Sequence, residues 1–398
     1  MELPARRLLV TRALRGFADG VVSVALAGYL SELGYSPSQI GAIVTSTLLG
    51  SAALSLLAGF VGDRFDQRRL LLGASLLMAA TGLGFAGVTA FWPLLVVAFV
   101  GTLNPSAGDV SAFLPIEQAL LAGLTNARDR THVFALYNLG GAFAGALGAL
   151  ATGVPAWLAL RAGLSLQLAY RATFLTYSLV AVVAAAIYVG LPAVQSATAT
   201  ARTSRLPLAK SRGTVLRLAA LFSLDSFGGG FVVQSLLALW LFRRFGLSIE
   251  ETGRVFFATG LLAAGSQLVS SRLARRIGHI RTMVYTHLPA NLCLIAAAFM
   301  PTAELAIGLL LCRMALAQMD VPARQAYVMA VVPPEERAAA ASVTNVPRSL
   351  ATALTPLLAG LLLESSDTGW PLVFGGAIKV VYDLLLLGMF ARVKPLEE

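Results

Sequence analysis

The feature that most constrains this chain is a series of long apolar stretches that recurs from one end to the other. Of its 398 residues, 57% are hydrophobic and only 13% are charged, which is more apolar surface than a soluble protein of this size needs. Stretches of about 20 apolar residues can cross the hydrocarbon core as helices. Because their hydrophobicity does not alternate, an outer-membrane barrel is excluded. The pattern predicts an all-α polytopic membrane protein.

We predict twelve transmembrane helices. They are placed at roughly 12–33, 38–61, 70–91, 93–123, 132–153, 170–190, 214–242, 250–271, 282–300, 303–331, 338–363 and 371–391. One polar segment, rich in Gln, Ser, Thr, Arg and Lys, divides the chain nearly in half. We therefore expect an N-terminal six-helix bundle over 1–192, a cytoplasmic linker over 193–213 and a C-terminal six-helix bundle over 214–398.

Lysine and arginine orient the predicted spans. With the N-terminus inside, the inside segments hold 21 Lys and Arg and the outside segments hold 4. The inside count includes Arg6, Arg7, Arg12 and Arg15, which precede the first apolar run. The positive-inside rule then places both termini and the linker in the cytoplasm. The net charge of +10 is explained by this orientation, so it does not indicate nucleic-acid binding.

The two halves repeat in the same orientation. Early in each half the offset is about 212 residues, and later it is about 207. The matched pairs include Gly34 with Gly246, Ser36 with Ser248, Gly41 with Gly253, Pro115 with Pro322, Gln118 with Gln325, Arg130 with Arg337 and Asn138 with Asn345. A parallel repeat of six spans is typical of secondary transporters, whose substrate sites lie near the membrane midplane at the repeat interface.

The loop between the second and third spans carries a recognisable motif. It reads Gly59-Phe-Val-Gly-Asp63-Arg64-Phe-Asp-Gln-Arg68-Arg69 and resembles the signature loop of the major facilitator superfamily, roughly Gly-x-x-x-Asp-Arg-x-Gly-Arg-Arg. A degenerate second copy runs from Ser271 to Arg281. Asp66 and Gln67 stand where the family usually has Gly and Arg. The resemblance covers the whole chain and implies the two-bundle fold of a prokaryotic transporter, with no subfamily assigned.

The resemblance also implies a conformational latch at this loop. In the family, the carboxylate that matches Asp63 sits against the cytoplasmic start of a helix, where unpaired N–H groups and the helix dipole stabilise a negative charge. The matching arginines join a relay of charges. We therefore expect Gly59, Asp63, Arg64 and Arg68 to hold the cytoplasmic side closed; the alternative is that they are solvated charges.

Ten ionisable residues lie well inside the predicted spans, where each charge costs about 2.5–3.5 kcal/mol even on lenient scales. They are Asp19, Asp109, Glu117, Asp225, Arg313, Asp320, Arg324, Arg348, Lys379 and Asp383. The first seven fall on spans 1, 4, 7 and 10, which line the central cavity in the resembled family. We expect Asp19, Asp109, Glu117, Asp225, Arg313, Asp320, Arg324 and Arg348 to form a substrate- and proton-binding cavity.

Spacing suggests which of these charges pair. Arg313, Asp320 and Arg324 fall within about 20° of one another on a helix, and Asp320 can pair with Arg324 four residues later. Glu117 holds the place in span 4 that Arg324 holds in span 10, which predicts that the two face each other. The alternative is a buried ion pair with a purely structural role, which is what we expect of Lys379 with Asp383.

Other chemistries have little support in the sequence. His132, His279 and His287 are too scattered for a metal or catalytic site, and we place them near cytoplasmic ends. The two cysteines lie inside predicted spans, and no phosphate-binding loop is present. We expect no enzyme activity, no cofactor and no metal.

The predicted function is secondary active transport of a small organic solute by alternating access. Buried carboxylates favour proton coupling, arginines favour a solute with an anionic group, and we expect export. The alternatives are an uncoupled facilitator and a receptor or scaffold that does not transport. We expect a monomer in the prokaryotic inner membrane, bound to lipid, protons and solute and not to nucleic acid.

Overall fold

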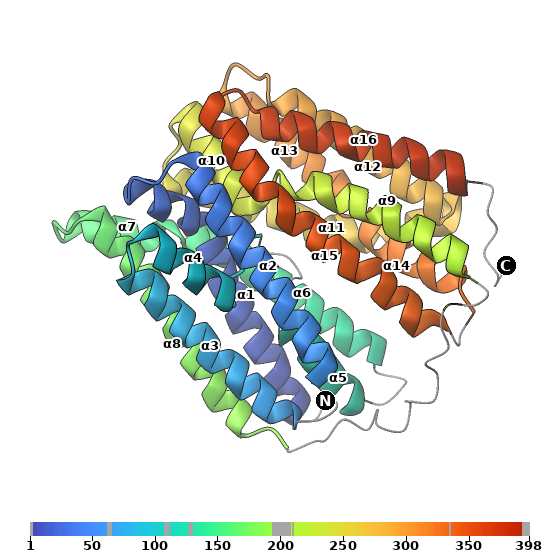
Figure 1. The fold of residues 1–398 in the computed structure, drawn as a ribbon, viewed down its shortest axis with the longest axis horizontal. Coiled ribbons are helices and arrows are strands. Elements are labelled where there is room, and N and C mark those ends of the chain that lie inside the picture. The colour runs from blue at the N-terminus through green and yellow to red at the C-terminus, as the bar shows by residue number, and fades with distance from the viewer. Residues whose placement is uncertain are drawn as a thin grey trace. The chain divides into compact units, whose positions relative to one another are not determined.

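The computed structural model describes residues 3–61, 66–106, 111, 113–125, 130–192, 208, 211–333 and 336–391. Within these ranges every regular element is an α-helix (Figure 1). The helices are α1 (Leu3–Glu32), α2 (Pro37–Val61), α3 (Gln67–Gly87), α4 (Phe91–Val100), α5 (Phe113–Gly123), α6 (Arg130–Ala151), α7 (Gly153–Arg161), α8 (Leu166–Val189), α9 (Arg212–Gly230), α10 (Gln234–Phe245), α11 (Ile249–Ile277), α12 (His279–Ala297), α13 (Ala303–Ala317), α14 (Asp320–Ala330), α15 (Arg337–Ser365) and α16 (Trp370–Phe390).

The helices account for all twelve expected spans. Within the described part of the chain, nine helical segments are long and apolar enough to cross a membrane. The other three expected spans correspond to α4 with α5, to α11 and to α12. The all-α polytopic prediction is therefore confirmed.

Several expected spans are interrupted by short breaks. Span 7 divides after three consecutive glycines, Gly228 to Gly230, into α9 and α10, and glycine is the residue that a helix interior tolerates least after proline. Span 10 divides into α13 and α14 at 318–319. Pro322 then falls in the first turn of α14, where its missing N–H is not needed. The breaks leave backbone groups without helical partners at these points.

The internal repeat is visible in two matched turns. Gly34 after α1 and Gly246 after α10 both adopt a positive φ, +83° and +65°, which glycine accepts at little cost. Ser36 and Gln39 then form a capping box at the start of α2, because the backbone N–H of each donates to the side-chain oxygen of the other. Ser248 and Glu251 form the same box at α11.

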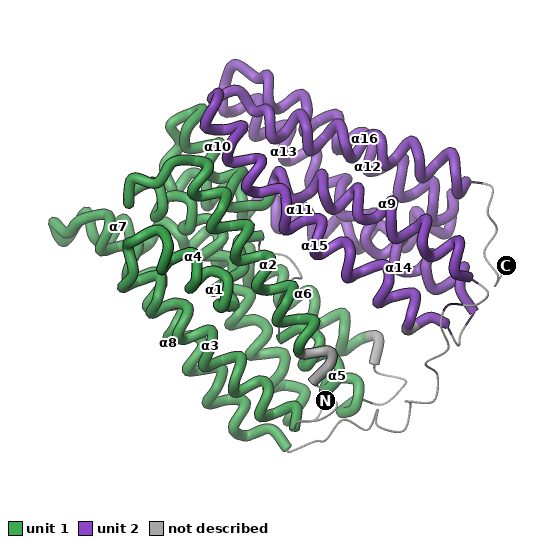
Figure 2. Tube along the Cα trace, in the orientation of Figure 1, with its two compact units in different colours: residues 1–202, 233–257 green, residues 203–232, 258–398 purple. Residues whose placement is uncertain are grey.

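The chain forms two compact units, coloured separately in Figure 2. Unit 1 comprises 1–202 and 233–257, and unit 2 comprises 203–232 and 258–398. The break after α9 is the point at which the chain passes from unit 2 back to unit 1, so that α10 packs against α1. The units differ in this respect from the expected bundles 1–192 and 214–398, which remain a prediction.

In unit 1, α1 packs against α6 and α8. Glycines bring α1 and α6 into backbone contact: a Cβ at Gly16 would lie 2.5 Å from the Gly141 carbonyl oxygen, and one at Gly20 would lie 2.0 Å from that of Gly145. Small residues four apart on facing helices permit this close approach in membranes. The glycines of the fifth predicted span thus serve helix packing.

In unit 2, α9 packs against α15 and α16, and α12 packs against α13, α14 and α16. A buried apolar cluster that includes Leu218, Phe222, Met283, Tyr327 and Leu386 joins α9, α12, α14 and α16. The four helices that share this cluster also carry the charged side chains described below.

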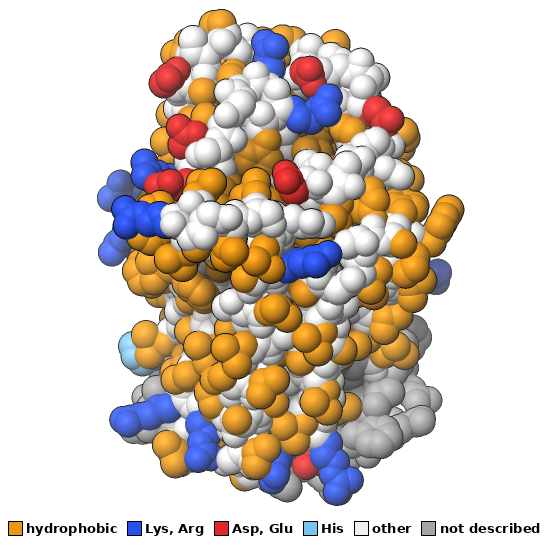
Figure 3. Space-filling view, turned by 90° about the vertical axis from the view of Figure 1, so that its left-hand side faces the viewer, with side chains coloured by type: hydrophobic (Ala, Val, Ile, Leu, Met, Phe, Trp, Pro, Cys, Tyr) orange, Lys and Arg blue, Asp and Glu red, His pale blue; other side chains and the backbone are white. Residues whose placement is uncertain are grey.

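The outer surface is suited to lipid. Figure 3 shows a face on which hydrophobic side chains cover the middle, while Lys and Arg gather toward its upper and lower ends. Many large apolar side chains are exposed, among them Leu76, Leu83, Leu179 and Val182. Exposed apolar patches of this extent mark a surface that a partner or membrane covers.

Candidate functional site: two buried charge clusters

The charged side chains within the helices gather into one cluster in each unit. In unit 1 the centre is Glu117 on α5, which is fully buried. Its Oε2 accepts from the Arg15 guanidinium and from the Tyr137 hydroxyl, the latter at 2.5 Å. Its Oε1 accepts from the Tyr188 hydroxyl at 2.5 Å and from Thr11 Oγ1 at 3.1 Å. Both oxygens of the carboxylate are thus saturated, as a buried charge requires.

Arg15 is the cationic partner of Glu117, and it is only 1% exposed. Its guanidinium also lies over the Phe113 ring, 4.0 Å from the centroid. Arg12 and Arg15 were expected among the charges that precede the first apolar run. Because α1 begins at Leu3, both lie well inside the helix, where both are buried.

Asp19 lies one turn beyond Arg15 on α1 and is 8% exposed. No hydrogen bond and no salt bridge joins its carboxylate to another residue that the structure describes. The two carboxylates of the expected cavity that the structure describes in this unit therefore differ: Glu117 is held by four donors, and Asp19 has none among the described residues. A buried carboxylate with no donor is the one for which carrying a proton costs least.

In unit 2 the centre is Asp225 on α9, which is 5% exposed. Its Oδ1 lies 2.5 Å from Lys379 Nζ and 3.7 Å from His287 Nε2, and its Oδ2 lies 3.3 Å from an Arg324 nitrogen. Three cationic or titratable side chains from α16, α12 and α14 thus converge on one carboxylate.

Arg324 links Asp225 to Asp320. One of its nitrogens lies 3.2 Å from Asp320 Oδ2 within α14, so the predicted pair four residues apart is confirmed. Its guanidinium also lies 5.5 Å from the centroid of the Phe222 ring. Arg324 finds its carboxylates within unit 2 and Glu117 finds its cation within unit 1; the predicted pairing of Glu117 with Arg324 remains a prediction.

The expected pair of Lys379 with Asp383 is wrong. Lys379 binds Asp225, and Asp383 instead contacts His287 Nδ1 at 2.9 Å and Asn291 Nδ2 at 2.9 Å. His287 is 5% exposed and lies in the middle of α12, not near an end as expected. The sequence signal that could have found this histidine is Asn291, one helical turn away, because two polar side chains at that spacing share a helix face.

Arg313 and Arg348 lie at the margin of this cluster, and both are partly buried. Arg348 Nε donates to Ser226 Oγ at 3.1 Å, next to Asp225, and another of its nitrogens donates to Asn345 at 3.2 Å. Arg313 has one contact to the sulfur of Met314 at 3.3 Å. No carboxylate of the described residues lies within salt-bridge distance of either arginine. Both can therefore bind an anion without first breaking an ion pair.

Part of the predicted site lies outside the described residues. These positions are Asp109 of the expected cavity and Asp63 and Arg64 of the expected latch; Gly59 lies in α2. Arg68 is half-buried near the start of α3, where its backbone N–H donates to the capping carboxylate of Asp66 at 3.1 Å. Asp66, the departure from the family motif, thus caps a helix.

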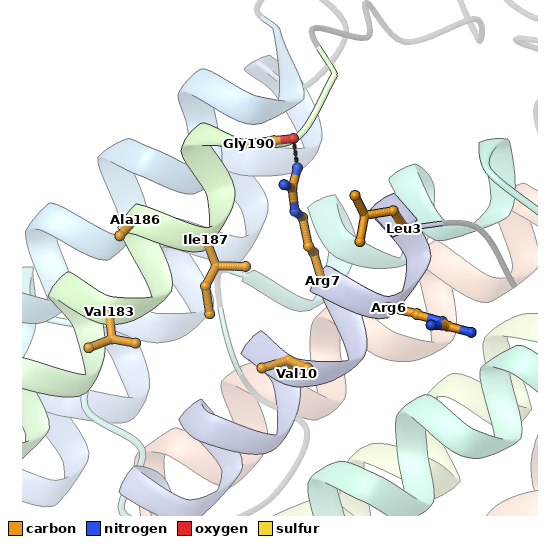
Figure 4. Close-up of a pocket in the computed structure, with 8 residues that line it drawn as sticks. All are labelled: Leu3, Arg6, Arg7, Val10, Val183, Ala186, Ile187 and Gly190. Carbon is orange, nitrogen blue, oxygen red and sulfur yellow. Dashed lines mark hydrogen bonds between the residues drawn. The ribbon is translucent and has the colours of Figure 1, made fainter.

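A separate hollow of about 540 Å³ lies between the start of α1 and the end of α8 (Figure 4). Arg7 reaches across it and donates to the carbonyl oxygen of Gly190, the C-cap of α8. The walls include Val10, Val183 and Ile187. The residues that line it belong to neither charge cluster.

Comparison with known proteins decides the family. The family model described as Major Facilitator Superfamily matches residues 8–319, which is most of the chain. The chain belongs to the major facilitator superfamily. It is a multi-pass membrane transporter and not an enzyme, as predicted.

Relatives match over nearly the whole chain. An uncharacterized membrane protein of Saccharomyces cerevisiae, YJR124C, is 26% identical over 417 residues, covering 96% of this chain and 92% of the yeast protein. The multidrug efflux protein YfmO of Bacillus subtilis is 24% identical over 387 residues, covering 92% and 88%. The inward-open structure of the xylose transporter XylE from E. coli superposes with a TM-score of 0.77 at 15% identity, covering 99% and 98%. The superposition supports the two-bundle fold.

Proposed function

We propose that the chain is a proton-coupled secondary active transporter of a small organic solute, working by alternating access. The observation that carries the proposal is the pair of buried charge clusters around Glu117 and Asp225. Charges inside a membrane protein are expensive and are typical of substrate pathways and proton relays. A protein that served only as a scaffold would be more stable with apolar side chains at these positions.

The unit 1 cluster contains a candidate proton site. Asp19 is buried and makes no hydrogen bond or salt bridge to the described residues, whereas Glu117 is fixed by Arg15 and three hydroxyl groups. We propose that Asp19 binds and releases the transported proton. In this proposal Glu117 sets the position of α5 against α1.

The unit 2 arginines favour a solute with an anionic group. Arg313 and Arg348 have no carboxylate partner among the described residues, and guanidinium groups bind carboxylate and phosphate in a bidentate manner. Protonation of Asp19 would remove one buried negative charge from the protein, which favours the binding of an anion. Proton and anion would then bind together, so an inward proton gradient would drive uptake.

Export is the second candidate, and it is the direction expected from the sequence. The similarity to the efflux protein YfmO over 92% of the chain favours it. Export against an inward proton gradient requires that proton and solute compete, which suits a cationic solute displaced from Asp19. The direction of transport is thereby tied to the sign of the solute charge.

Proteoliposomes with an imposed pH gradient test the proposal. A panel of organic acids, sugars, amino acids and cationic drugs is offered, and internal pH is followed together with solute. Proton influx with an anion supports uptake, and proton influx against a cation supports export. Asp19→Asn should abolish the response to the gradient, while Glu304→Gln, at an exposed carboxylate, should retain it. Solute flux unaffected by the gradient would establish the uncoupled facilitator, and the absence of any flux would favour a receptor or scaffold.

The proposal includes the setting of the protein. The lysine and arginine distribution supports cytoplasmic termini, and we propose a monomer in a prokaryotic inner membrane. Reaction of single cysteines introduced near each terminus with an impermeant reagent, in intact and in lysed cells, tests that orientation.

A further inference from the structure

His287 is a buried titratable side chain of unit 2 to which the sequence assigned no role. It lies on α12 with one ring nitrogen 2.9 Å from Asp383 Oδ1 and the other 3.7 Å from Asp225 Oδ1. The two carboxylates belong to different helices, α16 and α9. The imidazole ring therefore lies between two buried negative charges, with one nitrogen directed at each.

We propose that His287 is the proton-binding side chain of unit 2, with Nδ1–H held by Asp383 and with Nε2 gaining its proton toward Asp225. An ionised carboxylate only accepts hydrogen bonds, so Asp383 fixes a hydrogen on Nδ1. Asn291 Nδ2 donates to the other oxygen of Asp383 at 2.9 Å and holds that carboxylate in place. Asp383 thereby favours the Nδ1–H tautomer of the neutral ring, against the Asn291 Nδ2 donor that also lies 3.1 Å from Nδ1. In this tautomer Nε2 is left to gain or lose the proton.

The two carboxylates that flank the ring support a proton at this position. One ring nitrogen lies 2.9 Å from Asp383 Oδ1 and the other 3.7 Å from Asp225 Oδ1, so an imidazolium would face a negative charge at each nitrogen. The wider cluster does not add to this preference, because Arg324 and Lys379, with Arg313 and Arg348 at the margin, offset its three carboxylates. Unpaired charge is costly in a buried site, so the local geometry, and not the sum of charges, favours the protonated ring.

The groups that face His287 come from every helix packed on α12. They are Asp225 from α9 and Lys379, Asp383 and the ring of Tyr382 from α16. By way of Asp225 they also include Asp320 and Arg324 from α14 and Arg313 from α13. Lys379, at 2.5 Å from Asp225 Oδ1, opposes a second positive charge there. The two negative charges of Asp225 and Asp383 exceed the single positive charge of Lys379.

Protonation of His287 would change what Arg324 can do. With an imidazolium and Lys379 both at Oδ1 of Asp225, the contact of Oδ2 with Arg324 at 3.3 Å is needed less to neutralise that carboxylate. Arg324 keeps its contact with Asp320, and the side that faced Asp225 becomes available to an anionic group of the solute. This step rests on the proposed function, whereas the protonation of His287 does not.

The chain suits a direct test because it has only three histidines. In the double variant His132→Gln/His279→Gln, the full chain carries His287 alone. Nitrogen-15 NMR of histidine-labelled protein in lipid nanodiscs, recorded between about pH 5 and 8, separates imidazolium from each neutral tautomer. We expect the Nδ1–H tautomer at the upper end and imidazolium at the lower end. A ring that stays neutral throughout, or whose neutral form carries its hydrogen on Nε2, would overturn the proposal.

Two further substitutions in this single-histidine variant, the parent, test the roles of the two carboxylates. Asp383→Asn removes the fixed acceptor and should abolish the preference for the Nδ1–H tautomer. Asp225→Asn removes the charge that Nε2 faces and should eliminate the imidazolium signal from this pH range. If either variant does not fold, the spectrum of the parent still decides. Because NMR needs no solute, a titrating His287 together with flux indifferent to a pH gradient would refute coupling and leave the proton site standing.

Discussion

Removal of Arg15 should destabilise the protein far more than removal of a surface arginine. Arg15 and Glu117 are 1% and 0% exposed and form a salt bridge. In Arg15→Met, Glu117 keeps three hydroxyl donors but loses its only cation among the described residues. Stranding one member of a buried ion pair costs about 3–5 kcal/mol. The three remaining hydrogen bonds favour the lower end of that range, about 3 kcal/mol.

Two further variants separate the charge effect from packing. Arg15→Met/Glu117→Gln removes both charges, so the double variant should recover all but about 1–2 kcal/mol of the loss. Arg254→Met breaks the exposed pair with Glu250, whose side chains are 66% and 51% exposed, and should cost under about 1 kcal/mol.

Reversible denaturant unfolding in detergent micelles, followed by tryptophan fluorescence, measures all three variants against wild type. If Arg15→Met fell within about 1 kcal/mol of wild type, the buried pair would not contribute to stability as argued. A double variant as unstable as Arg15→Met would show that the lost packing of the arginine stem is responsible.

Three smaller changes test the framework around the clusters. Gly20→Ala places a methyl group 2.0 Å from a carbonyl oxygen of α6 and should destabilise the protein by about 1–3 kcal/mol. The control Gly73→Ala adds a methyl group with nothing within 4 Å and should be neutral or stabilising. Thermal unfolding compares the two variants. Tyr137→Phe removes one donor from the buried carboxylate of α5 and should cost about 1.5–3 kcal/mol in denaturant unfolding, and a smaller loss would mean that water replaces the hydroxyl. Ser248→Ala breaks the capping box of α11 and should cost about 0.5–2 kcal/mol; hydrogen exchange should rise in the first turn of that helix only, and faster exchange along all of α11 would contradict a local role.

The sequence predicts the helices well because hydrophobic length is a direct requirement of the bilayer. The turns that carry Gly34 and Gly246 were also recognisable, since a positive φ and a capping serine impose particular residue types. The breaks within spans 7 and 10 were not predicted. A helix interruption of two or three residues leaves the overall hydropathy of a span unchanged, so it is invisible to that signal.

Charge pairing shows where local spacing is sufficient and where it fails. Asp320 and Arg324 pair as their spacing predicts, but Lys379 and Asp383, with the same spacing, do not. A pair four residues apart gains only about 0.2–0.5 kcal/mol from its helix, so a nearer partner on another helix prevails, and Asp225 is that partner. The burial of Arg15 was not predicted for a related reason: a count of charges near helix ends does not show which of them has a partner on another helix.

The convergence of Lys379, Arg324 and His287 on Asp225 restricts how this protein can diverge. One carboxylate balances side chains from three helices. Its loss alone would leave the buried Lys379 without a counter-charge among the described residues, whereas Arg324 would keep Asp320 and His287 would keep Asp383. A substitution of Asp225 should therefore be accompanied by a substitution of its partner. Descendants that lack Asp225 are expected to have lost Lys379 as well, and an aligned set of such chains should show the two positions changing together while their neighbours vary independently.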